Sequence, residues 1–277
     1  MKDRNKDLQG KVAIVTGSGS ADGIGIVIVQ ELAKAGAKVV LTGRREKELV
    51  ELTEGLKKRG LDVACHLADM AEEKSIEGII KFTVNTFGRI DILVNNAAST
   101  AHPGDKDAMN MDTEAWDSIF AINTRGTMLA CKHAIPEMLK VGGGSIINMS
   151  SGTSLAGDMQ YTAYASSKGA VNTLTRYIAT QYGRQGIRCN ALIIGLVRTG
   201  GKAQDHLPAP VLKILEDNHA TGKLGRSEDV AKFIRFLSSD DAVWITGQHL
   251  NIDGGFFAHL PTTGPIADFM ASIAPKK

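Results

Sequence analysis

The sequence lacks an excess of charge of either sign. Of its 277 residues, 32 are basic and 30 are acidic, which gives a formal net charge of +2. Nucleic acids and anionic membrane surfaces are bound through a concentrated basic field, so we expect neither as a partner. The sequence also lacks an apolar run near the roughly 18 residues of a membrane span, and its polar beginning lacks the apolar stretch of a secretory signal. These absences predict a cytoplasmic protein.

Cysteine is scarce, and segments of linker composition are missing. Cys65, Cys131 and Cys189 lie far apart, without the Cys-x-x-Cys spacing of a zinc site or a redox pair. We therefore expect reduced thiols and no metal. The sequence contains no internal repeat, low-complexity stretch or Pro- or Ser-rich linker, so we expect residues 1–277 to form a single domain.

Short β-branched runs alternate with longer segments whose apolar residues recur at helical spacing. Several of the runs are apolar on both faces, as in parallel strands that helices cover on both sides. The predicted strands are residues 11–16, 38–42, 63–67, 90–95, 145–150, 188–193 and 249–252, and predicted helices include 24–35, 46–59, 75–87 and 113–139. The alternation predicts an α/β fold with a doubly wound parallel sheet of the Rossmann type.

Two segments break this alternation. Residues 198–225 follow a predicted strand directly and contain Pro208, Pro210 and several glycines, which is typical of the substrate loops of α/β folds. Residues 256–277 form a tail after the last predicted strand. Either segment is a candidate lid over a site.

A glycine-rich turn joins the first predicted strand to the first predicted helix. Such a turn lets backbone N–H groups approach a pyrophosphate, and the helix N-terminus adds about half a positive charge. A bare flexible turn is the alternative, but its position after the first strand of a β-α-β unit favours dinucleotide binding. The expected contacts are Gly17, Ser18, Ser20, Gly23, Ile24 and Gly25.

The end of the second predicted strand indicates which dinucleotide is bound. The sequence there is Thr42-Gly43-Arg44-Arg45, without the acidic residue that usually binds the adenosine ribose. An arginine fork matches the oxygens of a 2′-phosphate, so Arg44 and Arg45 favour NADP(H) over NAD(H). The alternative is that both arginines are solvated residues opening a helix. Asp22 opposes the prediction, because a carboxylate near the phosphates repels them unless it points away.

Tyr164 and Lys168 are four residues apart in a long helical stretch and therefore share a face. An ammonium close to a phenol favours the phenolate and lowers the phenol pKa from about 10, which suits acid–base work. Ser151 follows the predicted strand 145–150, at the sheet edge where α/β folds bind ligands. A pair such as Tyr164 and Lys168 is on its own more often a surface stripe, and such a serine is often only a strand-end cap.

Together, Ser151, Tyr164 and Lys168 resemble the catalytic residues of the short-chain dehydrogenase/reductase family, in the subgroup with a Tyr-x-x-x-Lys centre. The resemblance covers about residues 8–255. Further segments match the family in the same order: Asn95-Asn96-Ala97-Ala98, Asn123-Thr124-Arg125-Gly126 and Arg188-Cys189-Asn190-Ala191.

The resemblance implies a role for each matching residue. Tyr164 would be the general acid and base, Lys168 would hold the nicotinamide ribose and tune Tyr164, Ser151 would orient a carbonyl group, and Asn123 would anchor a proton-relay water. Asp69 would contact the adenine ring, Asn95 the adenosine side, and Val197 and Thr199 the nicotinamide carboxamide. Met70, Ala97 and Gly195 complete the expected cofactor contacts. The resemblance also implies a homotetramer or homodimer, with helices 113–139 and 161–182 at an interface.

The sequence departs from the family pattern at three places. The turn from Gly17 to Gly23 is two residues longer than usual, which leaves open which of Ser18, Gly19 and Ser20 meets the phosphates. Ala98 replaces a common glycine, and Ile194 stands where a proline normally precedes Gly195.

The leading hypothesis is an NADP(H)-dependent oxidoreductase that interconverts a secondary alcohol and a ketone by hydride transfer. Its small-molecule substrate is expected to be apolar (steroid-like, cyclic or terpenoid), because the loop and tail carry Leu207, Pro208, Val211, Leu212, Phe256, Phe257, Leu260 and Phe269. The alternative enzyme is a 3-oxoacyl-thioester reductase whose acyl carrier docks on Arg198, Lys202 and Lys213. An alternative of another class is a non-catalytic dinucleotide sensor, which would not need the acid–base residues.

Overall fold

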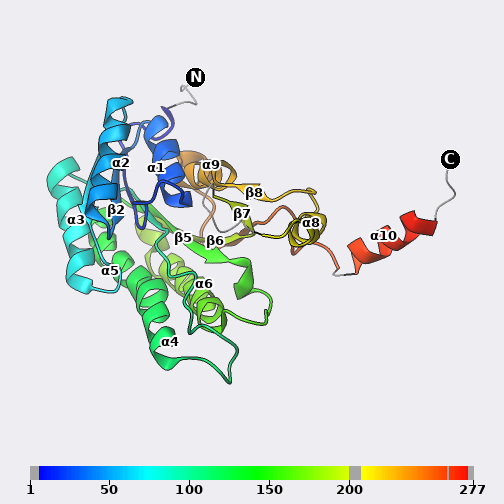
Figure 1. Cartoon of the computed structure of the whole chain (residues 1–277). Helices are drawn as coiled ribbons and strands as arrows, with labels where there is room; N and C mark the ends of the chain where they lie inside the picture. Colours follow the sequence, from blue (N-terminus) through cyan, green and yellow to red (C-terminus); the bar gives the residue numbers. More distant parts are fainter. Residues whose placement is uncertain (1–5, 200–206, 261, 274–277) are drawn as a thin grey trace.

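Seven parallel strands form the central sheet of the computed structural model, which describes residues 6–199, 207–260 and 262–273 (Figure 1). The strand order is β3-β2-β1-β4-β5-β6-β9. The strands are β1 (Val12–Val15), β2 (Lys38–Gly43), β3 (Val63–Leu67), β4 (Ile92–Asn95), β5 (Gly144–Ser151), β6 (Ile187–Ile194) and β9 (His249–Ile252). Each matches a predicted strand to within two residues, so the predicted doubly wound Rossmann-type sheet is confirmed.

Helices cover both faces of the sheet. One face carries α1 (Ile24–Lys34), α2 (Glu46–Lys58) and α9 (Ser227–Ser238), and the other carries α3 (Glu73–Phe87), α5 (Gly126–Lys140) and α6 (Thr162–Tyr182). Outside these layers lie α4 (Thr113–Phe120), which packs against α6, then α8 (Ala209–Asp217) and α10 (Thr263–Ile273). Two short strands, β7 (Val197–Arg198) and β8 (Gly225–Arg226), pair separately in parallel.

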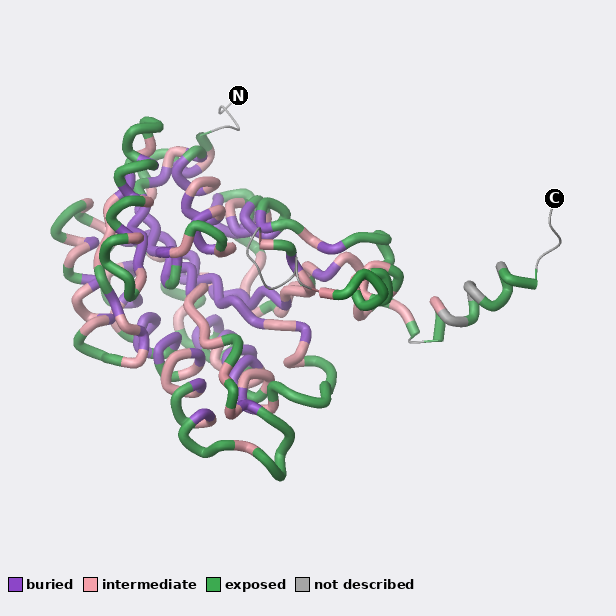
Figure 2. The backbone as a smooth tube through the Cα atoms, viewed as in Figure 1, coloured by how far each residue is buried: buried purple, intermediate pink, exposed green. Residues whose placement is uncertain are grey.

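The core lies on both sides of the central strands (Figure 2). In β1, Ala13 and Val15 pack among the residues of α1 and α9, whereas Ile14 packs among those of α3 and α5. Because successive side chains of a strand point to opposite faces, a strand with two covered faces needs apolar residues at every position. The continuous apolar sequence of β1 therefore follows from its central place in the sheet.

The predicted helix 113–139 is divided in two. A π-helical turn, Ala121–Arg125, separates α4 from α5. Within this turn Asn123 is fully buried, and its side chain bonds to Ser99 and Ser167 rather than to its own helix. A local widening of the helix at a polar residue is typical of functional regions. Helical periodicity did not reveal the interruption.

The strand order reverses between β1 and β4, which are neighbours although β2 and β3 lie between them in sequence. At such a switch point the loops that follow the two strands leave in opposite directions and open a crevice at the carboxyl edge. The glycine-rich turn follows β1 and the Asn-Asn motif follows β4. The fold thus brings these two motifs together.

The described parts of the two irregular segments each contain a helix. The predicted loop 198–225 contains α8, and its residues 200–206, with Lys202, lie outside the described residues. The start of the tail packs on the body: the Phe256 ring lies 5.1 Å from the His219 ring, and the His259 ring Nε2 lies 2.8 Å from the carbonyl oxygen of Asn218. Figure 1 shows α10 extending away from the sheet. Within the described ranges no helix has the length and apolar character to cross a membrane.

Candidate active site

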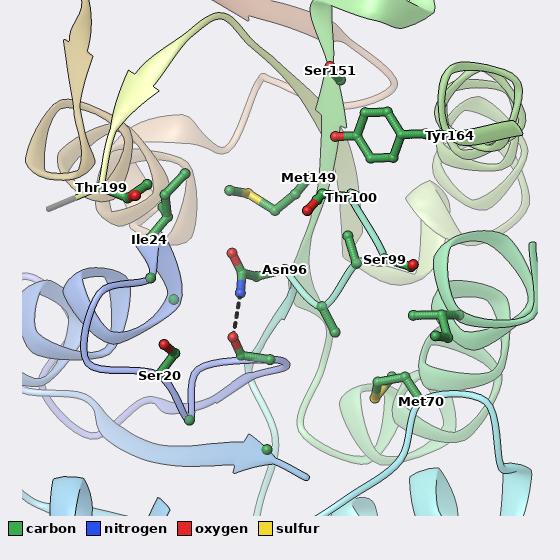
Figure 3. A pocket seen from close by; sticks show the side chains of 18 of the residues that line it. Ser20, Ile24, Met70, Asn96, Ser99, Thr100, Met149, Ser151, Tyr164 and Thr199 are labelled. Atoms are coloured by element: carbon green, nitrogen blue, oxygen red, sulfur yellow. Dashed lines mark hydrogen bonds between the residues drawn. The ribbon is translucent and has the colours of Figure 1, made fainter. Parts of the chain in front are cut away.

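A cavity of about 910 Å³ runs along the carboxyl edge of the sheet, from the glycine-rich turn to β5 and α6. Most residues that the sequence predicts for the site line this one cavity. They are Gly17, Ser20, Gly23, Ile24, Gly25, Arg44, Arg45, Asp69, Met70, Ala97, Ser151, Tyr164, Lys168, Gly195, Val197 and Thr199. Figure 3 shows Ser20 and Ile24 at one side of the cavity and Ser151 and Tyr164 at another.

Glycines let the turn after β1 lie directly against the loop after β4. Gly17 has a φ of +64°, and a Cβ atom there would lie 2.6 Å from the Ala97 Cα. At Gly25 a Cβ atom would lie 2.7 Å from the Asn96 Nδ2. Asn96 Nδ2 donates to the carbonyl oxygens of Thr16 and Gly17 at 2.9 and 3.0 Å, so the two loops are also hydrogen-bonded (Figure 3). Neither glycine position can take a larger residue without moving this wall.

The N-terminus of α1 opens into the cavity. Its N-cap residue is Gly23, and no side chain of the described residues caps this end. The first N–H groups of a helix lack partners inside the helix and carry partial positive charge, so this end fits a pyrophosphate. These residues therefore fit the predicted dinucleotide.

The two extra residues of the glycine-rich turn form a small loop of their own. The Gly23 N–H donates to the Ser20 carbonyl oxygen at 3.3 Å, and the Ala21 N–H donates to Glu48 Oε1 at 3.3 Å. The added length is therefore fastened to α2, while Gly19, Ser20 and Asp22 line the cavity. Asp22, whose negative charge opposes phosphate binding, thus belongs to the cavity wall.

Arg44 and Arg45 line the cavity where β2 ends, but their surroundings differ. Arg45 Nε lies 2.6 Å from Glu48 Oε2, so its charge is already paired. Arg44 is exposed and forms no ion pair with any described residue. Of the two, Arg44 is therefore the side chain with its charge available to a 2′-phosphate.

Three predicted contacts have side chains outside the cavity lining. Ser18 is fully buried; its Oγ donates to the Val15 carbonyl oxygen at 2.8 Å and accepts from the Thr42 N–H at 3.1 Å. Asn95 Nδ2 donates to Asn148 Oδ1 at 2.8 Å inside the sheet. Asn123 Oδ1 accepts from the Ser99 N–H at 2.7 Å, and its Nδ2 donates to Ser167 Oγ at 3.0 Å. The hydrogen bonds of these side chains hold neighbouring segments together behind the cavity wall, and their predicted roles toward a cofactor stay predictions.

At the other end of the cavity, β5 and α6 bring the predicted catalytic residues together. Ser151 is the last residue of β5, and the Tyr164 ring extends toward it from the first turn of α6 (Figure 3). Both hydroxyls face the cavity, and Ser151 Oγ accepts from the Thr153 N–H at 3.3 Å and from Thr153 Oγ1 at 3.0 Å. Lys168, one turn further along α6, is buried; its Nζ donates to the Met149 carbonyl oxygen at 2.7 Å and lies 5.6 Å from the centre of the Tyr164 ring.

The acid–base behaviour of this group differs from the expectation. Burial raises the pKa of Tyr164, and the nearby Ser151 side chain offsets this only in part. Burial also lowers the pKa of Lys168 to about 8. The predicted lowering of the Tyr164 pKa by Lys168 is therefore wrong for the protein alone, because desolvation disfavours both charged forms. Tyr164 is held in its protonated form.

Sequence reasoning missed part of the cavity wall. The additional lining residues there include Asn96, Ser99, Thr100, His102, Ser118, Ile122 and Leu196. Four of them follow β4 within a few residues, so the rule that ligands bind outside the carboxyl ends of strands was a usable signal. Ser118 and Ile122 come from α4 and the π-helical turn, for which the sequence offers no comparable signal. In the described part of the chain, no three His, Cys, Asp or Glu side chains are grouped to hold a metal ion.

The chain is similar to known proteins over most of its length. Residues 17–257 match a family model described as enoyl-(acyl carrier protein) reductase. A probable short-chain type dehydrogenase/reductase of Bradyrhizobium diazoefficiens is 40% identical to this chain. The match covers 92% of this chain and 90% of the length of that protein. The 7alpha-hydroxysteroid dehydrogenase of Bacteroides fragilis is 38% identical, over 92% of this chain and 97% of its own.

A solved structure shares the fold as well. The gluconate 5-dehydrogenase of Burkholderia cenocepacia, in complex with NADP and tartrate, superposes with a TM-score of 0.85 and is 28% identical, over 92% of this chain and 99% of its own. Sequence and fold thus agree over a span that includes both the glycine-rich turn and the residues around Tyr164. The chain belongs to the short-chain dehydrogenase/reductase family of oxidoreductases.

Proposed function

We propose that the protein is an NADP(H)-dependent oxidoreductase that interconverts a secondary alcohol and a ketone. The observation that carries the proposal is a single cavity with two chemically distinct ends. One end offers the uncapped N-terminus of α1 and Arg44, which has no ion-pair partner among the described residues; both suit phosphates. The other end offers the hydroxyls of Ser151 and Tyr164, which suit a carbonyl oxygen.

The proposed chemistry divides between cofactor and protein. A bound nicotinamide cofactor would supply the hydride to the carbonyl carbon of the substrate, or accept it from the corresponding alcohol carbon. Ser151 and Tyr164 donate hydrogen bonds to the carbonyl oxygen, where negative charge grows during reduction, and Tyr164 passes its proton to that oxygen. Its raised pKa keeps this proton in place at neutral pH, as a proton donor requires. The Lys168 ammonium, held at the Met149 carbonyl, stabilises the phenolate left behind.

For the cofactor, NADP(H) is favoured over NAD(H). Arg44 supports this preference because it lines the cavity and forms no ion pair with any described residue. The gluconate 5-dehydrogenase of similar fold was solved with NADP. Asp22, in the same wall, works against tight binding of either cofactor.

The proposed substrate is an apolar ketone or the corresponding alcohol, of the steroid-like or cyclic kind. The similarity to a hydroxysteroid dehydrogenase supports it. So do Ile122 and Leu196 in the wall and the exposed Val211 and Ile214 of α8. The wall also carries Ser99, Thr100 and His102, which would bind polar groups on such a substrate.

A 3-oxoacyl thioester is the second candidate substrate, because the matching family model is named for a reductase of acyl-carrier substrates. The expected docking patch gives it less support. Arg198 Nη2 lies 3.0 Å from Glu216 Oε1, and Lys213 Nζ lies 2.7 Å from Asp217 Oδ2, so both charges are paired within the loop. A non-catalytic sensor remains the alternative of another class, and only the absence of turnover would favour it.

The assembly and the compartment stay predictions. We propose a homotetramer or homodimer in the cytoplasm. Trp244, next to the edge strand β9, is 97% exposed and Val243 beside it is 64% exposed, which supports an interface in this region. The molar mass from light scattering during size exclusion tests it; a value near the 29.5 kDa of one chain would contradict it.

The test of the proposed function combines binding with turnover. The purified protein is titrated with NADPH and NADH and then supplied with steroid-like, cyclic and polyol-type ketones and a 3-oxoacyl thioester. We expect NADPH to bind more tightly and at least one apolar ketone to oxidise it. Tyr164→Phe should lose nearly all turnover and keep its NADPH affinity within a few-fold, since only the proton donor is removed. Full activity in Tyr164→Phe, or binding without turnover of any carbonyl, would count against the mechanism.

A further inference from the structure

We propose that Asp105 is a positioning residue for Tyr164. Its carboxylate fixes the first turn of α6, from which the Tyr164 side chain extends to Ser151. The inference rests on the proposed function, because it assigns a supporting role to a residue behind the proposed acid–base group. Asp105 belongs to none of the motifs that identify the family.

The contact itself is direct and buried. Asp105 is only 4% exposed although it is an acidic residue. Its Oδ1 accepts from the Ala163 N–H at 2.8 Å, and its Oδ2 accepts from the Tyr164 N–H at 3.0 Å. One carboxylate therefore binds two neighbouring N–H groups of α6 from a position 58 residues earlier in the chain. Burying a charged carboxylate destabilises the folded protein unless hydrogen bonds satisfy the carboxylate oxygens.

The first turn of α6 depends on this contact because it has no cap of its own. The N-cap residue is Tyr161, whose side chain makes no capping bond. Tyr161 also has a φ of +65°, the sole positive value among the described residues other than glycine. The first N–H groups of a helix have no partners within it, and an uncapped first turn frays. Tyr164 lies in this turn, so its position depends on a cap supplied by Asp105.

Further bonds join the Asp105 segment to the substrate side of the cavity. Thr162 Oγ1 donates to the Lys106 carbonyl oxygen at 2.7 Å. The Asp105 N–H donates to the His102 carbonyl oxygen at 2.9 Å, and the Gly104 N–H donates to His102 Nδ1 at 3.1 Å. The same segment begins with Ser99 and Thr100, which line the cavity beside Tyr164 (Figure 3). The wall after β4 and the first turn of α6 are thus held as one unit.

The test is the substitution Asp105→Asn. An amide offers one acceptor oxygen and one NH₂ group, so one of the two helix N–H groups loses its acceptor. We expect kcat on a ketone that the unaltered protein reduces to fall at least tenfold, while the dissociation constant of NADPH stays within twofold. A merely structural role would lower stability without separating kcat from cofactor affinity.

The matched control is Asp112→Asn. Asp112 is the exposed N-cap of α4, and its Oδ1 accepts from the Glu114 N–H at 2.9 Å. It is the same residue type and also caps a helix N-terminus, but it accepts one N–H rather than two, and its helix does not carry Tyr164. We expect kcat of this variant to stay within twofold of the original.

Hydrogen exchange followed by mass spectrometry provides a readout that needs no substrate. Peptides that cover residues 161–168 should exchange faster in Asp105→Asn than in Asp112→Asn. If the unaltered protein turns over no ketone, the proposed function fails, whereas faster exchange would still show that Asp105 orders this turn. Unchanged exchange, or faster exchange with unchanged kcat, would overturn the positioning role.

A second variant keeps the inference testable if Asp105→Asn does not fold. Thr162→Val removes the bond to the Lys106 carbonyl and leaves the buried carboxylate intact. We expect a two- to threefold loss of kcat and faster exchange over residues 161–168. If Asp105→Asn does not fold and Thr162→Val matches the original protein in both measurements, the inference is wrong.

Discussion

At the scale of single residues, burial decides the chemistry of the site more than pairing does. Lys168 and Tyr164 lie close together on α6, yet the pKa of Tyr164 is raised and that of Lys168 is lowered to about 8, both because of desolvation. Lys168 is 3% exposed, and its Nζ donates to one carbonyl oxygen at 2.7 Å. Its buried positive charge therefore lowers the free energy of unfolding. This penalty has a measurable consequence for the pH dependence of stability.

We expect the free energy of unfolding to rise between pH 8 and 10.5 because of Lys168. In this window the unfolded chain, with the lysine pKa near 10.5, binds the proton that the folded protein has released at its pKa of about 8. Below pH 8 both states hold the proton, and the penalty is constant. From pH 7.5 to pH 9.5, the free energy of unfolding of the unaltered protein should rise by roughly 2 kcal/mol more than that of Lys168→Met. This figure follows from about 1.4 kcal/mol per pKa unit.

Urea denaturation of both proteins at the two pH values measures this gain. The exposed Lys140, which pairs with Glu137 on the surface of α5, provides the control. Lys140→Met should show the same pH dependence as the unaltered protein. If the unfolding free energies of Lys168→Met and the unaltered protein change in parallel with pH, burial does not lower the pKa of Lys168.

At the scale of elements, the junction of β2 and α2 combines two features that look separate in the sequence. Glu48 on α2 pairs with Arg45 at 2.6 Å and accepts from the Ala21 N–H in the lengthened glycine-rich turn. The two added residues of that turn therefore do not lie free in the cavity. The same contact engages one of the two arginines predicted to hold a 2′-phosphate, which leaves the other for the ligand.

Arg44→Ala should weaken NADPH binding by more than tenfold and change NADH binding less than twofold. The reason is the loss of a charge-assisted contact that only the 2′-phosphate can make. Arg45→Ala is the matched comparison. It should weaken NADPH binding less than Arg44→Ala does, because Glu48 already pairs with Arg45. Titration of each variant with both cofactors measures the discrimination. Equal losses for both cofactors, or a larger loss in Arg45→Ala, would mean that the phosphate lies elsewhere.

The elements also show how far the sequence could predict the structure. Strands with two covered faces carry apolar residues throughout, so their places were readable, as β1 shows. The glycine-rich turn and the residues Ser151, Tyr164 and Lys168 were readable because a fixed spacing places them at one sheet edge. The π-helical turn at Asn123 and the cap from Asp105 were not, since both depend on contacts between residues far apart in sequence.

At the scale of the whole molecule, the tail has two parts with different relations to the body. Phe257 lies against Gly152, where an added Cβ atom would collide with the Phe257 ring, and Gly152 follows Ser151 directly. The Phe257 N–H also donates to Asp253 Oδ2 at 3.2 Å. By contrast, α10 presents Ile266, Phe269, Met270 and Ile273 to solvent. The first part is therefore continuous with the site, and the second is not.

Two truncations separate these parts. A chain that ends after Leu260 lacks α10 and should keep kcat, KM and NADPH affinity within about twofold, because the described contacts near Ser151 remain. A chain that ends after Gly255 also lacks Phe256, Phe257 and the His259 contact. It should lose several degrees of melting temperature and show a raised KM, since the ring that covers Gly152 is gone. Phe257→Ala in the full chain should reproduce the rise in KM. If instead the cut after Leu260 alone changes KM or the range of ketones accepted, α10 acts on the site, and the lid predicted for the tail includes it.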